Sequence, residues 1–384
     1  MTNRFIEDVA KLIDDPRVAG LRSHTTYESA LARTVTPPAG TLRSDGRDVE
    51  GEFELPDGTK AVTLDTWGSQ ASRMESAIEQ VADDIGYPLI RFVDEEGALL
   101  TTSVRLSHRH ADATWRAARK QLEGAGIPFL RLRDVTAQDA SLLLRWFPTA
   151  PIFGWWHSHT ANAQKEAKKL EKYDKETAEA FAGYARVHAD SRSARLVTSE
   201  IVATDVHRRV RRAARVDTLF GPLKSSRSTG SAKSDGPSAL GLGSLPPVEF
   251  SKAPIDVSYG AIEGTWFLSL TGLRRFGWGA NPKIAQALVV ALALLLRELT
   301  RLDGRLRAGT ELIAQTNGQI QVVGHGMEAV NWSDYSLGDL MDVVRELGAS
   351  VGWDGPVDVV IPADSVLGGL FKTADREAGE TDPS

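Results

Sequence analysis

The chain contains the stretch Arg195-Leu-Val-Thr-Ser-Glu-Ile-Val-Ala-Thr-Asp-Val-His-Arg-Arg-Val-Arg-Arg-Ala-Ala-Arg215. Its first part is apolar and β-branched and predicts a buried strand over 196–203. Its second part carries five arginines and one carboxylate between 205 and 215, on a chain with a formal net charge of −6. A positive patch on an acidic protein is typical of a surface that binds a polyanion, most often nucleic acid. A solvated basic face is the alternative.

The composition is that of an ordinary globular protein. The 384 residues are 42% hydrophobic and 25% charged, which permits one large domain or two to three small ones. The absence of cysteine excludes disulfides and thiolate metal sites. The first residues form no apolar signal core, so we predict a cytoplasmic protein. The longest apolar run, Ile284 to Leu296, is shorter than the ~20 residues that span a bilayer and predicts a buried helix.

Strand and helix patterns alternate along the chain. Two hairpins are predicted, at 52–64 around Pro56-Asp57-Gly58 and at 89–104 around Asp94-Glu-Glu-Gly97. Helical spacing of apolar residues predicts a helix from Ser69, its expected N-cap, to about Ile85. Further helices are expected at 4–13, 112–122 and 137–146, and further strands at 152–156 and 266–270. Strands and hairpins with covering helices predict an α/β or α+β sheet.

Two segments differ from the rest in composition. A charged helical insertion is expected over 160–190, because the part from Lys165 to Tyr184 is rich in Lys and Glu and has little apolar face. Between Gly221 and Pro247, 16 of 27 residues are Gly, Pro or Ser, which predicts a flexible loop. We expect a single domain over 1–372 that contains both insertions, followed by a disordered tail at 373–384.

The string Phe153-Gly-Trp-Trp-His-Ser-His-Thr160 suggests a metal site. His157 and His159 would share one face of a strand, a spacing that can ligate zinc. The string resembles the Gly-Trp-Tyr-His-Ser-His segment of the JAMM/MPN metalloproteases. In that family a serine and a metal-binding aspartate follow, at positions that hold Ala167 and Leu170 here. A zinc peptidase that uses His157 and His159 therefore stays as the alternative hypothesis.

No complete catalytic set emerges from the rest of the sequence. His108 and His110 have no partner with metal-like spacing, and no nucleophile and base can be paired from spacing. We therefore predict a protein that is not an enzyme and uses neither a metal nor another cofactor.

Five segments in order resemble one family, the RNA-binding backbone subunit of type I-G (formerly I-U) CRISPR Cascade complexes, in the RAMP superfamily. Two departures stand out: His157 lies where that family usually has Asp, and Trp67-Gly68 replaces a polar pair. The five segments are Leu64-Asp-Thr-Trp-Gly-Ser-Gln-Ala-Ser-Arg-Met-Glu75, Thr102-Ser-Val-Arg-Leu-Ser-His-Arg109, Ile152-Phe-Gly-Trp-Trp-His-Ser158, Arg195-Leu-Val-Thr-Ser-Glu-Ile-Val202 and Leu268-Ser-Leu-Thr-Gly-Leu-Arg-Arg-Phe276.

The resemblance implies an α+β fold with an RRM-like (ferredoxin-like) palm, whose large helical and loop insertions form a finger and a thumb. It implies a helical homo-oligomer in which copies stack head to tail along the CRISPR RNA beside other Cascade subunits. Target DNA would pair with the guide in antiviral defence, and a recruited helicase–nuclease would cleave it. The loop at 221–247 is the expected thumb. Because this subunit is not the nuclease, the resemblance agrees with the absence of a catalytic set.

A guide must be held without sequence preference, so we expect contacts to phosphates and 2′-hydroxyls. Gln70 and Arg73 lie three residues apart on one predicted helix and could reach the same stretch of RNA. Trp155, Trp156 and His157 could stack on a base. The predicted RNA-binding residues are Ser69, Gln70, Arg73, His108, Arg109, Trp155, His157, Arg195, Arg208, Arg209, Arg211, Arg212, Arg215, Arg274 and Arg275.

Overall fold

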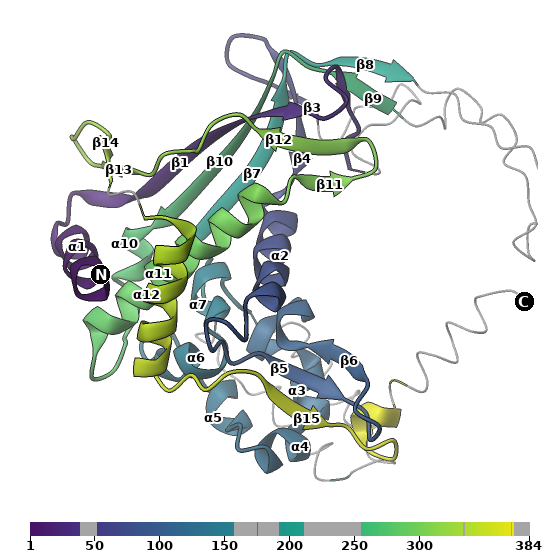
Figure 1. Cartoon of the computed structure of the whole chain (residues 1–384), viewed down its shortest axis with the longest axis vertical. Helices are drawn as coiled ribbons and strands as arrows, with labels where there is room; N and C mark the ends of the chain where they lie inside the picture. Colours follow the sequence, from purple (N-terminus) through teal and green to yellow (C-terminus); the bar gives the residue numbers. More distant parts are fainter. Residues whose placement is uncertain are drawn as a thin grey trace, which may run out of the picture.

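The computed structural model of the chain describes residues 1–38, 52–156, 175, 192–210, 255–332, 335–369 and 371. A large sheet occupies one end of the molecule and a group of short helices with a small sheet occupies the other (Figure 1). The helices α2 (Trp67–Ala77) and α11 (Pro282–Leu302) lie between these two parts. The fold is therefore α+β, as the sequence predicts.

The large sheet has nine strands, and all its neighbouring strands are antiparallel. The central order is β12-β1-β10-β7-β4, with β11 and β3 at the two edges. The strand β13 pairs with β1 next to β12, and β14 pairs with β13. The strands are β1 (Val18–Ser29), β3 (Glu52–Glu54), β4 (Lys60–Asp65), β7 (Val197–Thr204), β10 (Ala261–Ser269), β11 (Arg305–Arg307), β12 (Thr310–Ala314), β13 (Gln321–Gly324) and β14 (Val330–Asn331).

Two small sheets complete the strand structure. One joins β5 (Ile90–Val93) to β6 (Leu99–Thr102) and, in parallel, to β15 (Val357–Val360). The other joins β9 (Ile255–Ser258) to β2 (Thr34–Val35) and β8 (His207–Val210). Residues 211–254 of the chain connect β8 to β9.

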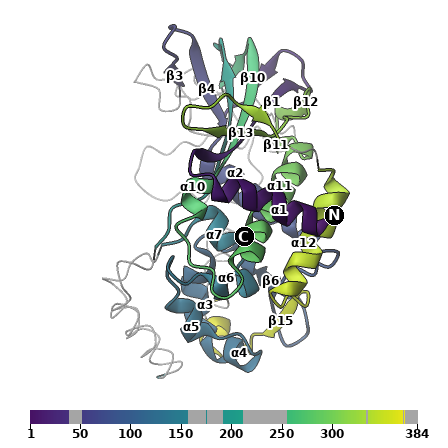
Figure 2. The ribbon, with the colours of Figure 1, turned by 90° about the vertical axis from the view of Figure 1, so that its left-hand side faces the viewer.

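The remaining helices are short, apart from α1 and α12. In Figure 2, α1 runs across the middle of the molecule, below the sheet and above the short helices. The helices other than α2 and α11 are α1 (Thr2–Asp14), α3 (Ala113–Ala117), α4 (Arg119–Gly124), α5 (Phe129–Arg133), α6 (Ser141–Trp146), α7 (Thr149–Phe153), α10 (Leu270–Leu273) and α12 (Leu337–Ser350). The 3₁₀ turns are η1 (Ile78–Gln80), η2 (Ser103–Arg105) and η3 (Arg109–Ala111).

The large sheet has one covered and one open face. Along β1, Leu21, Ser23 and Thr25 are buried, whereas the alternating Arg22 and His24 are exposed. The same alternation holds along β7 and β10, because successive strand residues point to opposite faces. The helices α2 and α11 cover the first face. The open face is left to solvent or to a partner.

The helix α11 is the centre of the core. It begins with Pro282 in its first turn, where the missing N–H costs nothing, and its residues from Ala287 to Leu296 are all buried. It packs against α1, α2 and α12. One connected cluster of buried apolar side chains extends from Phe5 to Leu367. None of the described helices is long and apolar enough to cross a membrane.

Most predicted elements are present, including the helix near 4–13, both hairpins and the buried helix at 284–296. The predicted strand at 152–156 is wrong: α7 continues to Phe153, and Gly154 ends it with φ of +76°. The N-cap of α2 is Thr66 rather than Ser69. The single helix expected at 112–122 is split at Ala118 into α3 and α4. The insertion at 160–190, apart from Lys175, the loop at 221–247 and the tail at 373–384 lie outside the described residues.

Candidate nucleic-acid interface

The first turn of α2 divides the predicted residues into inward and outward ones. The Thr66 side chain caps the helix by accepting a hydrogen bond from the backbone N–H of Ser69, at 3.3 Å, and Ser69 is exposed. Gln70 points into the protein and is buried. Its amide nitrogen donates to the carboxylate of Asp65, and its amide oxygen accepts from the hydroxyl of Ser199 at 3.0 Å. Gln70 therefore joins α2 to β4 and β7, and only Ser69 of this pair faces outward.

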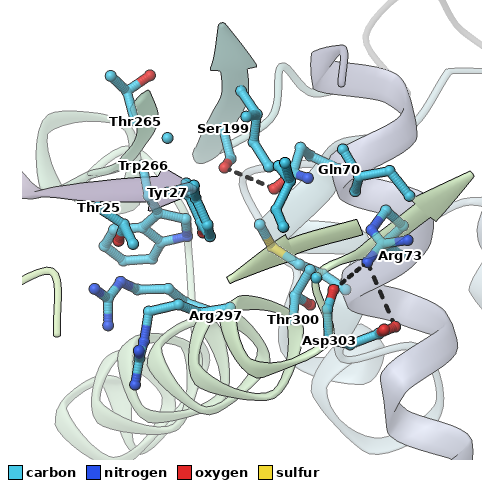
Figure 3. Close-up of a pocket in the computed structure, with 17 residues that line it drawn as sticks. Thr25, Tyr27, Gln70, Arg73, Ser199, Thr265, Trp266, Arg297, Thr300 and Asp303 are labelled. Carbon is cyan, nitrogen blue, oxygen red and sulfur yellow. Dashed lines mark hydrogen bonds and ion pairs between the residues drawn. The ribbon is translucent and has the colours of Figure 1, made fainter. Parts of the chain in front are cut away.

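Arg73 also points inward, into a small cavity between α2, α11 and the sheet (Figure 3). Its guanidinium donates to the backbone carbonyls of Asp303 and Arg305 and lies 3.6 Å from Asp65 and 3.4 Å from the carboxylate of Asp303. The cavity measures about 30 Å³, room for a water molecule or two. Gln70 and the two Nη atoms of Arg73 thus form hydrogen bonds within the protein, and the buried Nε of Arg73 faces Asp65 without a hydrogen bond to any described residue. Neither side chain is presented to one stretch of RNA.

Arg109 forms a buried ion pair beneath the surface. Its Nε and Nη2 each donate to a different oxygen of Glu75 at 2.7 Å, and its Nη1 donates to the carbonyl of Gly154 at 2.8 Å. Glu75 is 5% exposed and Arg109 is 11% exposed. Burial raises the pKa of Glu75 above its ordinary value, and the Arg109 guanidinium opposes that rise. Arg109 therefore fixes α2 to the turn after α7.

The two adjacent tryptophans after α7 have opposite environments. Trp155 is buried and packs edge-on against His110, 5.2 Å between ring centroids. Trp156 is 61% exposed, and its Nε1 donates to Nδ1 of His108 at 3.0 Å. Of the two, Trp156 is the ring that is accessible to a partner in this structure, whereas the predicted contact Trp155 is buried. The sequence places both beside each other and does not show this difference in burial.

Arg195 is an exposed cation close to these groups in the fold. Its Nη1 donates to the carbonyl of Trp67 at 2.9 Å, and no carboxylate among the described residues lies within 4.0 Å of it. Partial burial and the charge of Arg109 lower the pKa of Arg195. Trp67 is 52% exposed, and its Nε1 donates to Oε2 of Glu200 at 3.0 Å. A guanidinium without a carboxylate partner is available to an incoming anion.

We call the exposed side chains of Trp67, Ser69, Trp156 and Arg195 the Trp–Arg surface. Backbone hydrogen bonds hold its segments together: Trp155 exchanges two with Ser193, at 2.9 and 3.1 Å, and Leu196 donates to Ile152 at 2.8 Å. Segments near residues 67, 108, 156 and 195 are thus adjacent in space. These are four of the predicted RNA-binding regions.

The basic cluster lies at the other end of β7. Arg208 is on β8 and pairs with Glu52 at 2.6 Å, whereas Arg209 is exposed and has no carboxylate within 4.0 Å among the described residues. The eight residues of β7 separate these arginines from Arg195 by about 25 Å. His157, Arg211, Arg212 and Arg215 lie outside the described residues.

The adjacent Arg274 and Arg275 have opposite environments. The guanidinium of Arg274 donates to four backbone carbonyls, at 2.7–2.8 Å, in the last turn of α1 and just after it. Arg275 is exposed, at the end of the sheet where β7 begins and β10 ends. Arg274 is therefore a helix-capping residue in this structure, and Arg275 is the one that faces solvent.

The metal hypothesis finds no support in the described part of the chain. Within those residues no group of three or more His, Cys, Asp or Glu side chains could hold a metal ion. His108 is instead held by Trp156, and His110 is buried among aromatic rings. His157 and His159 lie outside the described residues.

Comparison with known proteins gives one family. Residues 25–176 match the family model described as CRISPR-associated protein GSU0053. A chain of a solved "CRISPR RNA-guided surveillance complex, pre-nicking" is similar with a TM-score of 0.31 and 8% identity, over 79% of this chain and 74% of that one. No curated protein matches. Over residues 25–176, which include Trp67, Ser69 and Trp156, the chain is similar to a family of CRISPR-associated proteins.

Proposed function

We propose that this chain is a non-catalytic, RNA-binding backbone subunit of a type I-G CRISPR Cascade complex. Copies would assemble along the CRISPR RNA and expose it for pairing with target DNA in antiviral defence. The observation that carries the proposal is the match of residues 25–176 to a CRISPR-associated family, because that span supplies three of the four residues of the Trp–Arg surface.

The strand order supports an RRM-like palm. In chain order, β1, α2, β7, β10, α11 and then β12 with β13 form a β-α-β-β-α-β path. In space the strands run β12/β13-β1-β10-β7, and both helices lie on one face. This order supports a ferredoxin-like palm, a fold in which the face without helices can bind a ligand.

The ion-pairing of the arginines supports a grip on phosphates. Arg195, Arg209 and Arg275 are exposed and have no carboxylate within 4.0 Å among the described residues. Arg109 and Arg208 each pair with a glutamate. Cations whose charge is not neutralised within the protein are the ones that release counterions from a nucleic acid. We therefore assign phosphate binding to Arg195, Arg209 and Arg275.

The proposed partners follow from the assembly. A head-to-tail contact between copies is heterologous and need not close, so its length can be set by the RNA. Besides the CRISPR RNA and further copies, the partners would be other Cascade subunits, paired target DNA and a recruited helicase–nuclease, which supplies cleavage.

Native mass spectrometry with RNA sequencing tests the proposal, on protein purified from cells that carry its own CRISPR array and neighbouring genes. The expected result is several copies on one RNA of fixed length. A monomer without nucleic acid that retains one zinc ion per chain would overturn the proposal and favour a peptidase that uses His157 and His159.

A further inference from the structure

Two tryptophans on the Trp–Arg surface are exposed and at the same time fixed in place. Trp67 is 52% exposed and Trp156 is 61% exposed. Water contact with so much aromatic surface is unfavourable, and single exposed apolar residues alone would need no explanation. Here, however, two of the largest apolar side chains are exposed on segments that both form hydrogen bonds with residues 193–195.

Each indole is held by its only polar atom. Nε1 of Trp67 donates to Glu200, and Nε1 of Trp156 donates to Nδ1 of His108, both at 3.0 Å. Because Nδ1 of His108 accepts, the proton of a neutral ring must lie on Nε2. With the N–H satisfied by the protein, what each indole offers to a partner is its apolar ring.

Hydrogen bonds connect the Arg195 segment to the backbone segments of both tryptophans. The Arg195 guanidinium binds the carbonyl of Trp67, and the segment pairs through Ser193 with Trp155, the neighbour of Trp156. An exposed cation with exposed aromatic rings on neighbouring segments is the usual composition of a site for single-stranded nucleic acid, in which the cation meets the phosphate and the rings meet the bases.

We infer that Trp67 and Trp156 are a pair of stacking platforms for unpaired nucleobases, with Arg195 as the phosphate contact between them. The inference rests on the proposed function and adds the mode of contact: the RNA is held through the faces of its unpaired bases, without regard to their identity. Duplex RNA is a poor ligand for such a pair because its bases are already stacked on one another. Fixing each ring before binding lowers the entropy that binding would otherwise cost.

Fluorescence anisotropy with the full chain and two RNA probes tests the inference. The first probe is a single-stranded RNA of about 15 nucleotides, and the second has the same length and charge but is abasic over its central part. The unmodified protein is expected to bind the first probe more tightly. Trp67→Ala and Trp156→Ala should each weaken binding to the first probe roughly tenfold and leave binding to the second unchanged.

Three further variants separate base stacking from phosphate binding and from the loss of any exposed apolar side chain. Arg195→Ala should weaken binding to both probes by the same factor, because it removes a phosphate contact. Trp67→Phe, which keeps an aromatic ring, should retain most of the affinity. Leu31→Ala, which removes an exposed apolar side chain beyond the far end of β1, is the matched control and should change neither.

The outcomes test the stacking pair separately from the proposed RNA-binding function. Equal binding of both probes by the unmodified protein, or tryptophan variants that lose affinity for both alike, would overturn the stacking pair while leaving RNA binding intact. Failure to bind either probe, together with RNA-free protein from the native host, would overturn the proposed function itself.

Discussion

Arg109 holds Glu75 through two parallel hydrogen bonds of 2.7 Å in a site where both side chains are nearly excluded from water. The third contact of the guanidinium, to the carbonyl of Gly154, joins the pair to the turn that carries Trp156. Such a site needs a glycine at 154, because a Cβ there would lie 2.6 Å from the carbonyl oxygen of Ser193. The ion pair is thus the internal support of the Trp–Arg surface.

Removing one member of this pair should be costly. Glu75→Gln leaves the charge of Arg109 buried without its counter-ion, and we expect a loss of about 3–5 kcal/mol in the free energy of unfolding. Urea denaturation measures it. Asp342→Asn, which breaks the exposed pair with Arg345, is the control and should cost less than about 1 kcal/mol. Similar losses for the two variants would contradict the structural assignment.

We expect Arg274 to contribute to the free energy of unfolding and its neighbour Arg275 to contribute little. Arg274→Met leaves four carbonyls between Leu12 and Val18, from the last turn of α1 to the start of β1, without their donor, which should cost about 1.5–3 kcal/mol and speed hydrogen exchange in α1. Arg275→Met, at an exposed position, should leave both measurements within error. A larger effect of the second variant would show that α1 is held in another way.

The same turn predicts a dependence on pH. Hydrogen bonds from the Arg17 side chain lower the pKa of Asp15 from 3.8 to about 2. A carboxyl whose pKa is lower in the folded protein stabilises it fully above pH 3.8, and the contribution is lost as the pH falls towards 2. The difference in unfolding free energy between the unmodified protein and Asp15→Asn should therefore be constant above about pH 5 and shrink below about pH 4. In an Arg17→Met background this dependence should become smaller without vanishing, because the backbone N–H of residue 17 still donates to Asp15 at 2.9 Å.

The arginines should differ in their effect on RNA binding. Arg195→Ala removes a cation without a carboxylate partner and should lower the slope of log K against log salt by about 0.7. Arg208→Ala removes a charge that Glu52 already balances, so a smaller change is expected. Filter binding over a range of salt concentrations measures both. A larger slope change for Arg208 would contradict the assignment of phosphate binding to the arginines without a carboxylate partner.

Two leucines of α11 test its place in the core. Leu292 is fully buried, and Leu292→Ala should cost about 2–5 kcal/mol because a cavity remains. Leu302, in the same helix, is 64% exposed, and Leu302→Ala should change stability by less than about 0.5 kcal/mol. Thermal and urea unfolding of the two variants give the comparison.

Periodicity in the sequence predicted the elements whose burial follows a simple repeat. The strand from Val197 has alternating buried residues, and the apolar run from Ile284 has no polar face, so both were identified. The segment at 152–156 was misread because its aromatic residues suit a strand, whereas Gly154 ends a short helix there. The residues around Gly154 do not show that a Cβ at this position would clash with the backbone of Ser193.

Residue type could not separate the exposed arginines from those the protein itself engages. Arg73, Arg109 and Arg274 lie in the segments that carry the resemblance, yet each donates to carbonyl or carboxylate groups of the chain. These partners lie far away in the sequence, at Arg305 for Arg73 and at Leu12 to Val18 for Arg274. Only the fold supplies them. Trp67 departs from the pattern of the family that the sequence resembles, but the sequence does not show that its ring is exposed.

The strands β8 and β9 have a consequence for how this chain can vary. Val210 and Ile255 are directly opposite partners in that strand pair, so the chain leaves β8 and enters β9 at neighbouring points. The entropy of joining two such points by a flexible connection changes only with the logarithm of its length. For a connection of that kind, insertions or deletions between β8 and β9 would cost little free energy, and the two strands would keep their register.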